Sequence, residues 1–346
     1  MKKLIYLLVL AIAIVSCRKD KYMPEKKPIS TIFTSDPVPL APHCIGDYDL
    51  YSTDSFDYVK QPLDAGFFNV PYLFYKDNYL YKFPVFNPNN PYEIIYERED
   101  ATQNATLVSE IWKFSFCTGE ATLIANNFYY NLDWGSNGWI IYTGTGHRIH
   151  KIKDNGDSLT ALSTQSGYNR AGKWNPSATL YWNNHEQEFL IKDKKGVTVS
   201  TVLYLPIDWI NDSIVLTLGT GNVFNTLNVF TGEMSLLNST WVPPIQSRGY
   251  VLDKLNGCCY VTKINGLGYM DYYLKYDLKG TNQVDTLANL YDSYRYTGGD
   301  VTNNKIITLF GRREWADSTV NTQYLRLNIL LMDLDATNEH IVNIPE

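Results

Sequence analysis

The chain is poor in charged residues and lacks a strong excess of either sign. Asp, Glu, Lys and Arg make up 19 % of its 346 residues, below the usual quarter, which disfavours coiled coils and long surface helices. The formal net charge is -6, and no basic run with interleaved aromatic residues occurs. A nucleic-acid-binding protein would show such a basic footprint, so we expect no nucleic-acid partner. The hydrophobic share of 45 % excludes wholesale disorder.

Short motifs that would identify an enzyme are also missing. The sequence contains no G-x-S-x-G elbow and no H-E-x-x-H zinc motif. Two GTG triplets, 144–146 and 219–221, lack the following helix that a phosphate-binding loop needs, so we predict hairpin turns there. The acidic residues Glu97, Glu99 and Asp100 are expected in a solvated loop. A pair of catalytic carboxylates contributed by distant segments stays open.

The N-terminal apolar stretch, residues 4–15, is too short to span a bilayer, which needs about 20 apolar residues. It follows Lys2 and Lys3, and this order is typical of a secretory signal peptide, here residues 1–16. The segment Ile14-Val15-Ser16-Cys17 resembles the bacterial lipoprotein box. The resemblance implies cleavage before Cys17 and an acyl anchor, such as palmitate, on that cysteine. An ordinary signal peptide with a chance cysteine is the alternative.

Residues 17–65 are expected to join this anchor to a folded domain. The part up to about Pro42 contains Pro and Ser without an apolar period, which indicates a tether. Arg18 follows the cysteine, in place of the aspartate that would resemble an inner-membrane retention signal. We therefore expect a lipoprotein anchored in the outer membrane of the bacterial cell envelope, on the periplasmic or the surface side.

Aromatic residues are abundant at 14 %, and they suit the pleated surface of a sheet. A hairpin-like segment, with two alternating apolar stretches around a polar turn, recurs along the chain. Its six copies are 111–124, 148–162, 188–202, 223–237, 272–287 and 329–344. The first five copies carry a turn glycine, which suits positive φ, at Gly119, Gly156, Gly196, Gly232 and Gly280.

A second element, an aromatic residue followed by a tight polar turn and a β-rich run, precedes each hairpin. Trp134, Trp174 and Trp209 occupy the same place in three copies. The six copies are 83–97, 130–144, 171–182, 206–218, 250–264 and 296–310. Each unit thus holds four short strands in roughly 36–50 residues, which matches a propeller blade. One such sheet cannot bury both of its faces, so neighbouring sheets must stack around an axis.

The units resemble the WD-like repeat of TolB-type propellers. In that family an aromatic residue and a Pro/Asn-rich turn join the first two strands, and a Thr-Gly-Glu-like turn joins the last two. The match is best at 86–90, 118–120, 134–138, 174–176 and 231–233. The resemblance implies an all-β, six-bladed β-propeller over residues 66–346, and it says almost nothing about activity. Five or seven blades, or a β-sandwich, are the alternatives.

Residues 43–79 precede the first clear unit and are rich in aromatic residues. We expect them to add an outer strand that closes the ring, or else to cap the first blade.

In a propeller, the turns between second and third strands share one face with the loops between blades, and we take this as the ligand face. His147 and His185 fall in such turns of adjacent units. Two independent surface histidines are favoured over a metal site, which would need a third ligand. Tyr and Arg are frequent at binding hot spots. The further ligand-face candidates are Tyr129, Tyr130, Tyr168, Arg170, Tyr204, Arg248, Tyr294 and Arg295.

Besides Cys17, the chain has Cys44, Cys117, Cys258 and Cys259. An exported protein permits disulfides, and these four cysteines allow three pairings. Free, partly buried thiols are equally compatible with the sequence.

These observations predict a lipid-anchored binding or scaffold module for a protein, peptide or glycan, with no cofactor and no metal. The alternative is a carbohydrate- or lactone-directed hydrolase or lyase with its active site in the central channel. A channel lined by Tyr, Asn and Thr would support binding, whereas a cation or a carboxylate pair there would support catalysis.

Overall fold

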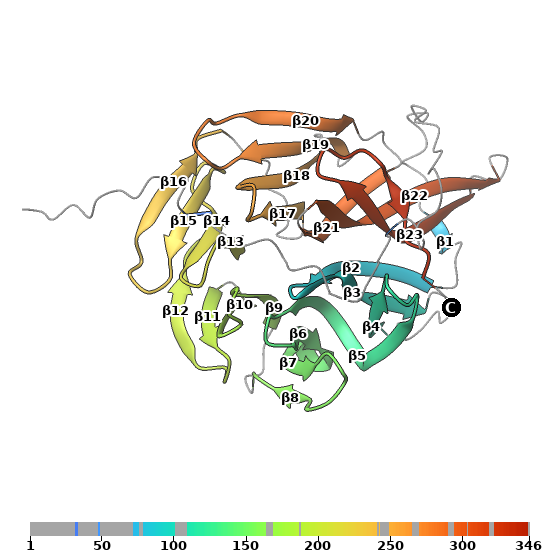
Figure 1. The fold of residues 1–346 in the computed structure, drawn as a ribbon, viewed down its shortest axis with the longest axis horizontal. Coiled ribbons are helices and arrows are strands. Elements are labelled where there is room, and N and C mark those ends of the chain that lie inside the picture. The colour runs from blue at the N-terminus through green and yellow to red at the C-terminus, as the bar shows by residue number, and fades with distance from the viewer. Residues whose placement is uncertain are drawn as a thin grey trace, which may run out of the picture.

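Short antiparallel strands account for most of the chain that the structure describes (Figure 1). The computed structural model describes residues 32–33, 48, 72–75, 79–100, 109–163, 169–186, 188–240, 242, 249–264, 270–289, 294–302, 304–317 and 322–344. Helix in these residues is limited to short turns such as the 3-10 turn η4 (Thr145–His147). A search of the same residues for a long, apolar helix that could cross a membrane finds none.

The first two blades share one long strand. Blade 1 consists of β2 (Tyr79–Asn87), β3 (Asn90–Asp100), β4 (Ser109–Ser115) and the first half of β5 (Ala121–Trp134). Blade 2 consists of the second half of β5, β6 (Trp139–Gly144), β7 (Arg148–Lys153) and β8 (Thr160–Ala161). Strand β5 pairs with β4 up to Phe128 and with β6 from Phe128 onward, so the two blades form one continuous sheet.

The next three blades are separate four-stranded sheets. Blade 3 consists of β9 (Asn169–Trp174), β10 (Leu180–His185), β11 (Glu188–Asp193) and β12 (Thr198–Val202). Blade 4 consists of β13 (Leu205–Trp209), β14 (Ile214–Leu218), β15 (Phe224–Asn228) and β16 (Met234–Asn238). Blade 5 consists of β17 (Tyr250–Asp253), β18 (Cys258–Ile264), β19 (Met270–Asp277) and β20 (Val284–Asn289).

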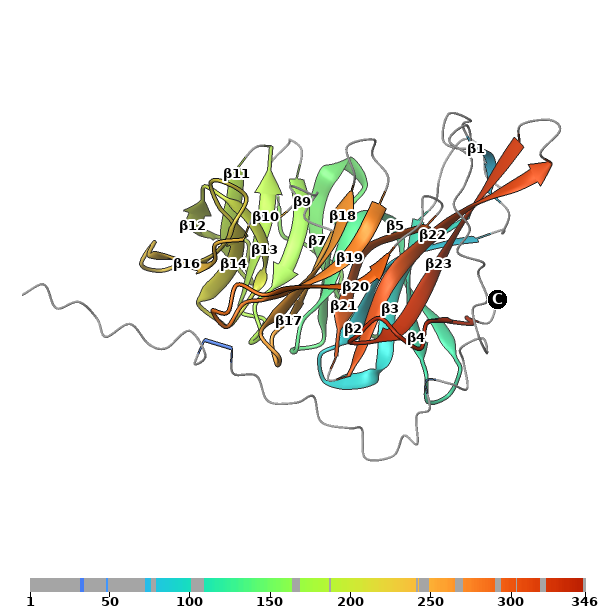
Figure 2. The ribbon, with the colours of Figure 1, turned by 90° about the horizontal axis from the view of Figure 1, so that it is seen from above.

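Blade 6 combines strands from both ends of the chain. It consists of β21 (Tyr294–Val301), β22 (Lys305–Asp317), β23 (Thr322–Asp333), β24 (His340–Ile341) and β1 (Tyr72–Tyr75). Strand β24 pairs antiparallel with Leu330 and Leu331 of β23. Strand β1 pairs in parallel with β23 near its start, at residues 323–325. Figure 2 shows β1 beside the long β22–β23 hairpin. Of the two roles expected for residues 43–79, β1 fulfils that of an outer strand.

The structure confirms the six-bladed β-propeller predicted from the repeat, and it excludes five blades, seven blades and a β-sandwich. Each hairpin copy in the sequence forms the third and fourth strands of a blade, and each second element forms the first and second strands. All five turn glycines have positive φ, from 72° at Gly119 to 105° at Gly280. Both GTG triplets lie in hairpin turns between the second and third strands of their blades, as predicted.

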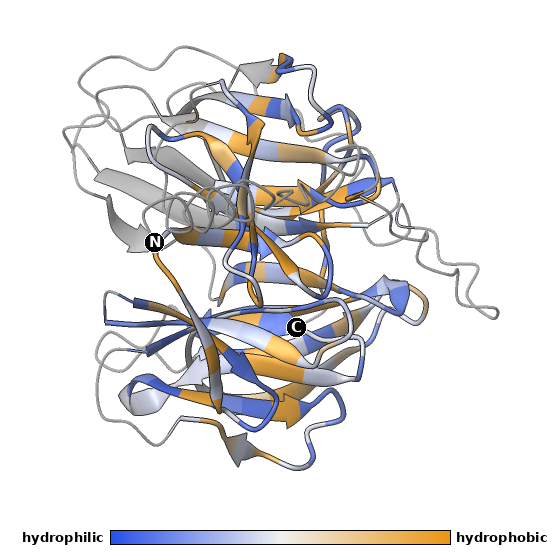
Figure 3. Ribbon diagram, turned by 90° about the vertical axis from the view of Figure 1, so that its left-hand side faces the viewer, coloured by the Kyte–Doolittle hydropathy of each residue, from blue (hydrophilic) through white to orange (hydrophobic). Residues whose placement is uncertain are grey.

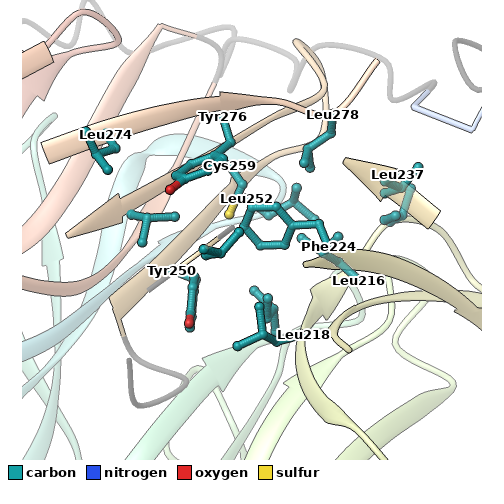
Figure 4. Close-up of a cluster of buried hydrophobic side chains, with 14 of the residues drawn as sticks. Leu216, Leu218, Phe224, Leu237, Tyr250, Leu252, Cys259, Leu274, Tyr276 and Leu278 are labelled. Atoms are coloured by element: carbon teal, nitrogen blue, oxygen red, sulfur yellow. The ribbon is translucent and has the colours of Figure 1, made fainter. Parts of the chain in front are cut away.

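The core lies between blades because alternate residues of a strand point to opposite faces of its sheet. In β14, Val215 packs against blade 3, whereas Leu216 packs against blade 5. Figure 4 shows the second of these layers, in which Leu216 and Phe224 of blade 4 meet Leu252 and Cys259 of blade 5. In Figure 3, apolar residues form bands across the strands, and hydrophilic residues prevail in the turns.

Two residues of the N-terminal segment pack against the ring. Phe33 is 5 % exposed and belongs to the core layer between blades 4 and 5. Tyr48 packs against Tyr92 and Phe116 of blade 1, and its hydroxyl donates a hydrogen bond of 2.7 Å to the carbonyl oxygen of Pro91. Phe33, in the part expected to act only as a tether, thus contributes to the propeller core. Tyr48 lies within residues 43–79, and its packing on blade 1 agrees with the expected cap of the first blade. Cys17 and the predicted signal peptide lie outside the described residues.

Candidate functional site

A cavity of about 490 Å³ lies where the six innermost strands end. These strands are β2, β5, β9, β13, β17 and β21, which lie nearest the centre of the ring in Figure 1. The lining comes from their last residues and from the turns that follow them, so every blade contributes. Exposed residues such as Pro176 and Asp212 form its rim and open it to solvent.

One residue per blade occupies the same repeat position in this cavity, immediately before Trp134, Trp174, Trp209 or their counterparts. We call these six the axial residues: Val85, Asp133, Lys173, Asp208, Leu252 and Asp300. Four of the six are charged, although they lie at the buried ends of the innermost strands. Charged groups in such a place need partners, because burial removes their hydration.

Asp208 is the carboxylate on which both lining lysines converge. Its Oδ2 lies 2.6 Å from Nζ of Lys173, and its Oδ1 lies 3.5 Å from Nζ of Lys254. Burial disfavours the charged form of Asp208, but the two lysines outweigh burial and hold the pKa of this carboxyl below its ordinary value. Burial likewise opposes the charge of Lys173, yet Asp208, Asp300 and Asp133 raise the pKa of its ammonium above the ordinary value.

Asp133 and Asp300 instead accept hydrogen bonds from the backbone of neighbouring blades. The N–H of Trp174 in blade 3 donates to Asp133 of blade 2 over 2.7 Å, and the N–H of Phe86 in blade 1 donates to Asp300 of blade 6 over 3.0 Å. Burial raises the pKa of Asp133 to about 7, against the pull of Lys173, and burial also raises the pKa of Asp300. These two carboxyl groups therefore link blades and also hold protons more tightly than usual.

Several polar groups that line the cavity have no hydrogen-bond partner in the described structure. They are the hydroxyl of Thr302 and the indole N–H groups of Trp134 and Trp174. These residues are 8 %, 4 % and 4 % exposed, respectively. The equivalent indole of Trp209 does have a partner, because it donates to the carbonyl oxygen of Lys173 over 2.9 Å.

The cavity combines a carboxyl group that titrates near pH 7 with two ammonium groups and buried aromatic rings. Such a site is suited to bind a polar or charged group, and Asp133 has the pKa required of a general acid or base near neutral pH. No cluster of three His, Cys, Asp or Glu side chains that could hold a metal ion occurs in the described part of the chain.

The ligand-face candidates lie at the other ends of the same strands. Arg170 precedes Lys173 by three residues in β9, Tyr204 lies just before β13, and the remaining described candidates of this group are Tyr129 and Tyr130 in β5 and Tyr294 and Arg295 in β21. Tyr168 and Arg248 lie outside the described residues. Of these candidates, Arg170 and Tyr204 do not line the cavity. Their contact with a ligand stays a prediction.

His147 and His185 occupy equivalent turns of blades 2 and 3, as expected from the sequence. His147 has a φ of 57° in the turn η4. Nδ1 of His185 lies 2.9 Å from Oδ1 of Asn169 on the neighbouring strand. Like Arg170 and Tyr204, neither histidine lines the cavity.

The cysteines differ in state. Cys258 and Cys259 are buried free thiols, whereas Cys117 is in a disulfide. Cys259 lies in the layer between blades 4 and 5, and burial raises the pKa of its thiol well above the ordinary value. Cys44 lies outside the described residues.

The prediction that Glu97 and Glu99 lie in a solvated loop is wrong. Both belong to β3 and are 2 % and 3 % exposed. Lys82, on the adjacent strand β2, forms an ion pair with Glu99 and lies 4.0 Å from Glu97. Register explains the difference: Lys82 is directly opposite Glu97, so the strand carries its acidic residues with a compensating cation.

The axial residues were not predicted from the sequence, although the repeat contains a signal for them. Asp133, Lys173 and Asp208 each precede the tryptophan that marks the second element. A charged residue at the same position of several repeat units indicates a shared polar environment, and in a closed ring that environment is the axis.

Comparisons with known proteins find solved structures that are similar to this chain. TolB from Acinetobacter baumannii is 12 % identical with a TM-score of 0.36, and the match covers 76 % of this chain and 54 % of that one. A putative TolB from Agrobacterium tumefaciens is 11 % identical with a TM-score of 0.46, covering 69 % of this chain and 89 % of that one. An oligogalacturonate lyase in complex with manganese is 9 % identical with a TM-score of 0.38, covering 54 % of this chain and 63 % of that one.

This chain therefore spans less than two thirds of the Acinetobacter TolB and of the lyase. No family model matches the chain, and no curated protein matches it by sequence. The architecture itself follows from the strand pairings: the chain is a six-bladed β-propeller, and TolB proteins are among the solved structures to which it is similar.

Proposed function

We propose that this protein is a lipid-anchored binding module of the bacterial cell envelope, which holds part of a protein, peptide or glycan in its central cavity. The anchor rests on the lipoprotein box that ends at Cys17. The binding role is supported by one observation above all. The cavity is lined by all six blades, and its carboxylates are fixed in place by hydrogen bonds from backbone N–H groups and from lysine. Such a rigid polar surface is suited to binding, because little order must be gained when a ligand enters.

Affinity capture from envelope fractions tests the binding role. The full chain is compared with Asp300→Asn, which removes a charge from the cavity, and with Glu233→Gln, which removes a charge from an exposed hairpin turn. We expect wild type and Glu233→Gln to retain the same partner and Asp300→Asn to lose most of it. Recovery of no partner, together with turnover of a substrate, would overturn the proposal.

Metabolic labelling with a palmitate analogue tests the anchor. Wild-type protein is expected to take up the label and to fractionate with the outer membrane, because several acyl chains on one cysteine give stable anchoring. Cys17→Ser should lose both properties, whereas Cys258→Ser, a change at a buried thiol, should keep them. An unlabelled wild-type protein would contradict the anchor.

A hydrolase or lyase is the second candidate, and the charged lining favours it. The cavity holds both a cation and carboxylates, and the pKa of Asp133 is raised to about 7. A carboxyl group of this kind transfers protons efficiently near neutral pH. A panel of glycans and lactones, assayed with wild type and Asp133→Asn, separates the two functions. Turnover that falls at least about 100-fold in the variant would establish catalysis.

A further inference from the structure

The cavity has a marked excess of acidic side chains. Its lining includes five aspartates, Asp133, Asp208, Asp212, Asp253 and Asp300, but two lysines, Lys173 and Lys254. Both ammonium groups lie on the same carboxylate, that of Asp208. Asp133 and Asp300 therefore face the cavity with backbone N–H groups as their hydrogen-bond donors. These two carboxyl groups can therefore pair with a cation that enters the cavity from solvent.

The surrounding groups favour an ammonium over an anion or a neutral ligand. An ammonium donates three hydrogen bonds, and the carboxylates of Asp133 and Asp300 and the unpartnered hydroxyl of Thr302 are acceptors in the lining. Trp134 and Trp174 are also lining residues, although their side chains pack mainly in the core layers between blades. An anion would be repelled by the excess of aspartates. The described residues contain no cluster of side chains that could hold a metal ion. Asn211 and Lys254 also line the cavity, and their N–H groups can donate to a hydroxyl or carbonyl oxygen of the same ligand.

We propose that the central cavity recognises a protonated primary amine, held by Asp133, Asp300 and Thr302, on a ligand that also carries hydroxyl or carbonyl oxygens. The volume of about 490 Å³ falls in the range of small-molecule sites and accommodates an amino sugar or the end of a lysine side chain. This inference rests on the proposed binding function and names the chemical group that the cavity selects.

The raised pKa values of Asp133 and Asp300 agree with this assignment. Burial is the main cause at both carboxyl groups. The charged groups that act on Asp133 are Lys173 from β9, Asp208 from β13 and Asp300 from β21. Lys254 also acts on Asp300. Two lysines among three carboxylates leave a deficit of positive charge, which a bound ammonium would supply.

Calorimetric titration of the full chain tests the inference with a matched pair of probes, glucosamine and N-acetylglucosamine. The nitrogen is a charged ammonium in glucosamine and a neutral, bulkier amide in N-acetylglucosamine. We expect glucosamine to bind at least about tenfold more tightly, since the acetylated nitrogen cannot form an ion pair. Equal affinity for the two sugars, or no binding of glucosamine, would overturn the inference.

Variants locate the binding. Asp300→Asn should weaken glucosamine binding at least tenfold while keeping an oxygen acceptor for the N–H of Phe86. Asp212→Asn, on the exposed rim, should weaken it a few-fold and serves if the first variant fails to fold. Glu233→Gln should leave it unchanged. Loss of affinity in Glu233→Gln equal to that in Asp300→Asn would contradict the assignment to the cavity.

The outcome also separates this inference from the proposed function. If the captured partner is not displaced by glucosamine but is lost in Asp300→Asn, the binding role stands and amine selection fails. If neither a partner nor glucosamine binds, both fail.

Discussion

Burial of the charged axial residues affects the free energy of folding, and this effect depends on pH. A carboxyl group whose pKa rises from 3.8 to about 7 on folding binds its proton more tightly in the folded state. The folded state is therefore favoured below the lower value and loses this advantage as the pH rises through about 7. The full effect of such a shift is about 4 kcal/mol, so Asp133 makes the stability of this protein strongly pH-dependent.

Asp133→Asn should consequently stabilise the protein at pH 8.5 and have little effect at pH 4. The asparagine keeps an oxygen that accepts the N–H of Trp174, but it carries no charge to desolvate. Urea unfolding at both pH values measures the difference, which we expect to reach a few kcal/mol at the higher pH. A variant that is less stable than wild type at pH 8.5 would show that the ionised carboxylate stabilises the ring.

Lys173→Met should have the opposite effect. It removes the cation that pairs with Asp208 and that faces Asp133 and Asp300. Removing one partner of a buried ion pair costs about 3–5 kcal/mol, and the cost should shrink at low pH as the carboxyl groups take up protons. Lys195→Met, at an exposed turn, is the matched control and should change stability by less than about 0.5 kcal/mol. Equal effects of the two variants would argue against the axial network.

For single residues, the sequence predicted which residues lie in turns better than it predicted which charged residues are buried. Turn glycines were found because a single property, positive φ, determines them. Glu97 and Glu99 were misplaced because their burial depends on Lys82, whose register opposite Glu97 exists only once the two strands pair. The axial charges were missed for the same reason, since the six strands converge only in the closed ring.

At the scale of the element, the hairpin that joins β11 and β12 connects two blades. Gly196 in its turn has a φ of 90°, and a Cβ there would overlap the carbonyl oxygen of Leu162 in blade 2. Gly232, in the equivalent turn of blade 4, has a φ of 72° and open space around it. A side chain at either glycine would therefore strain the backbone, but only a side chain at Gly196 would also overlap a neighbouring blade.

Gly196→Ala should destabilise the protein more than Gly232→Ala. The left-handed conformation alone costs a side chain about 1–2 kcal/mol, which both variants bear. The overlap with Leu162 should add about 2 kcal/mol to the first variant, in line with overpacked sites. Thermal unfolding of both proteins measures the difference. If they unfold at the same temperature, the turn of blade 3 does not contact blade 2 as described.

The blades could be predicted because the same four-strand pattern recurs in successive units of the sequence. What it could not show was how the units join. The single strand β5 serves two blades, and β1 adds a parallel outer strand to β23. Neither follows from local alternation, since both depend on pairings between distant segments.

At the scale of the whole molecule, the N-terminal segment fastens the ring at two places. Phe33 fills the layer between blades 4 and 5, and Tyr48 packs on blade 1. Phe33→Ala should destabilise the protein by about 3–5 kcal/mol, as expected for a buried phenylalanine. The matched control is Phe230→Ala, because Phe230 is 62 % exposed. Denaturant unfolding should show a clearly lower free energy of unfolding for Phe33→Ala than for Phe230→Ala. Equal stabilities would show that the N-terminal segment is not part of the core.

The proposed binding site lies where the innermost strands end, and not at the face of Arg170 and Tyr204. A crystal structure of the full chain soaked with glucosamine tests this most directly. We predict density for the sugar between Asp133 and Asp300, with its nitrogen near Thr302. Sugar bound at the opposite ends of these strands, with the cavity holding water alone, would contradict it.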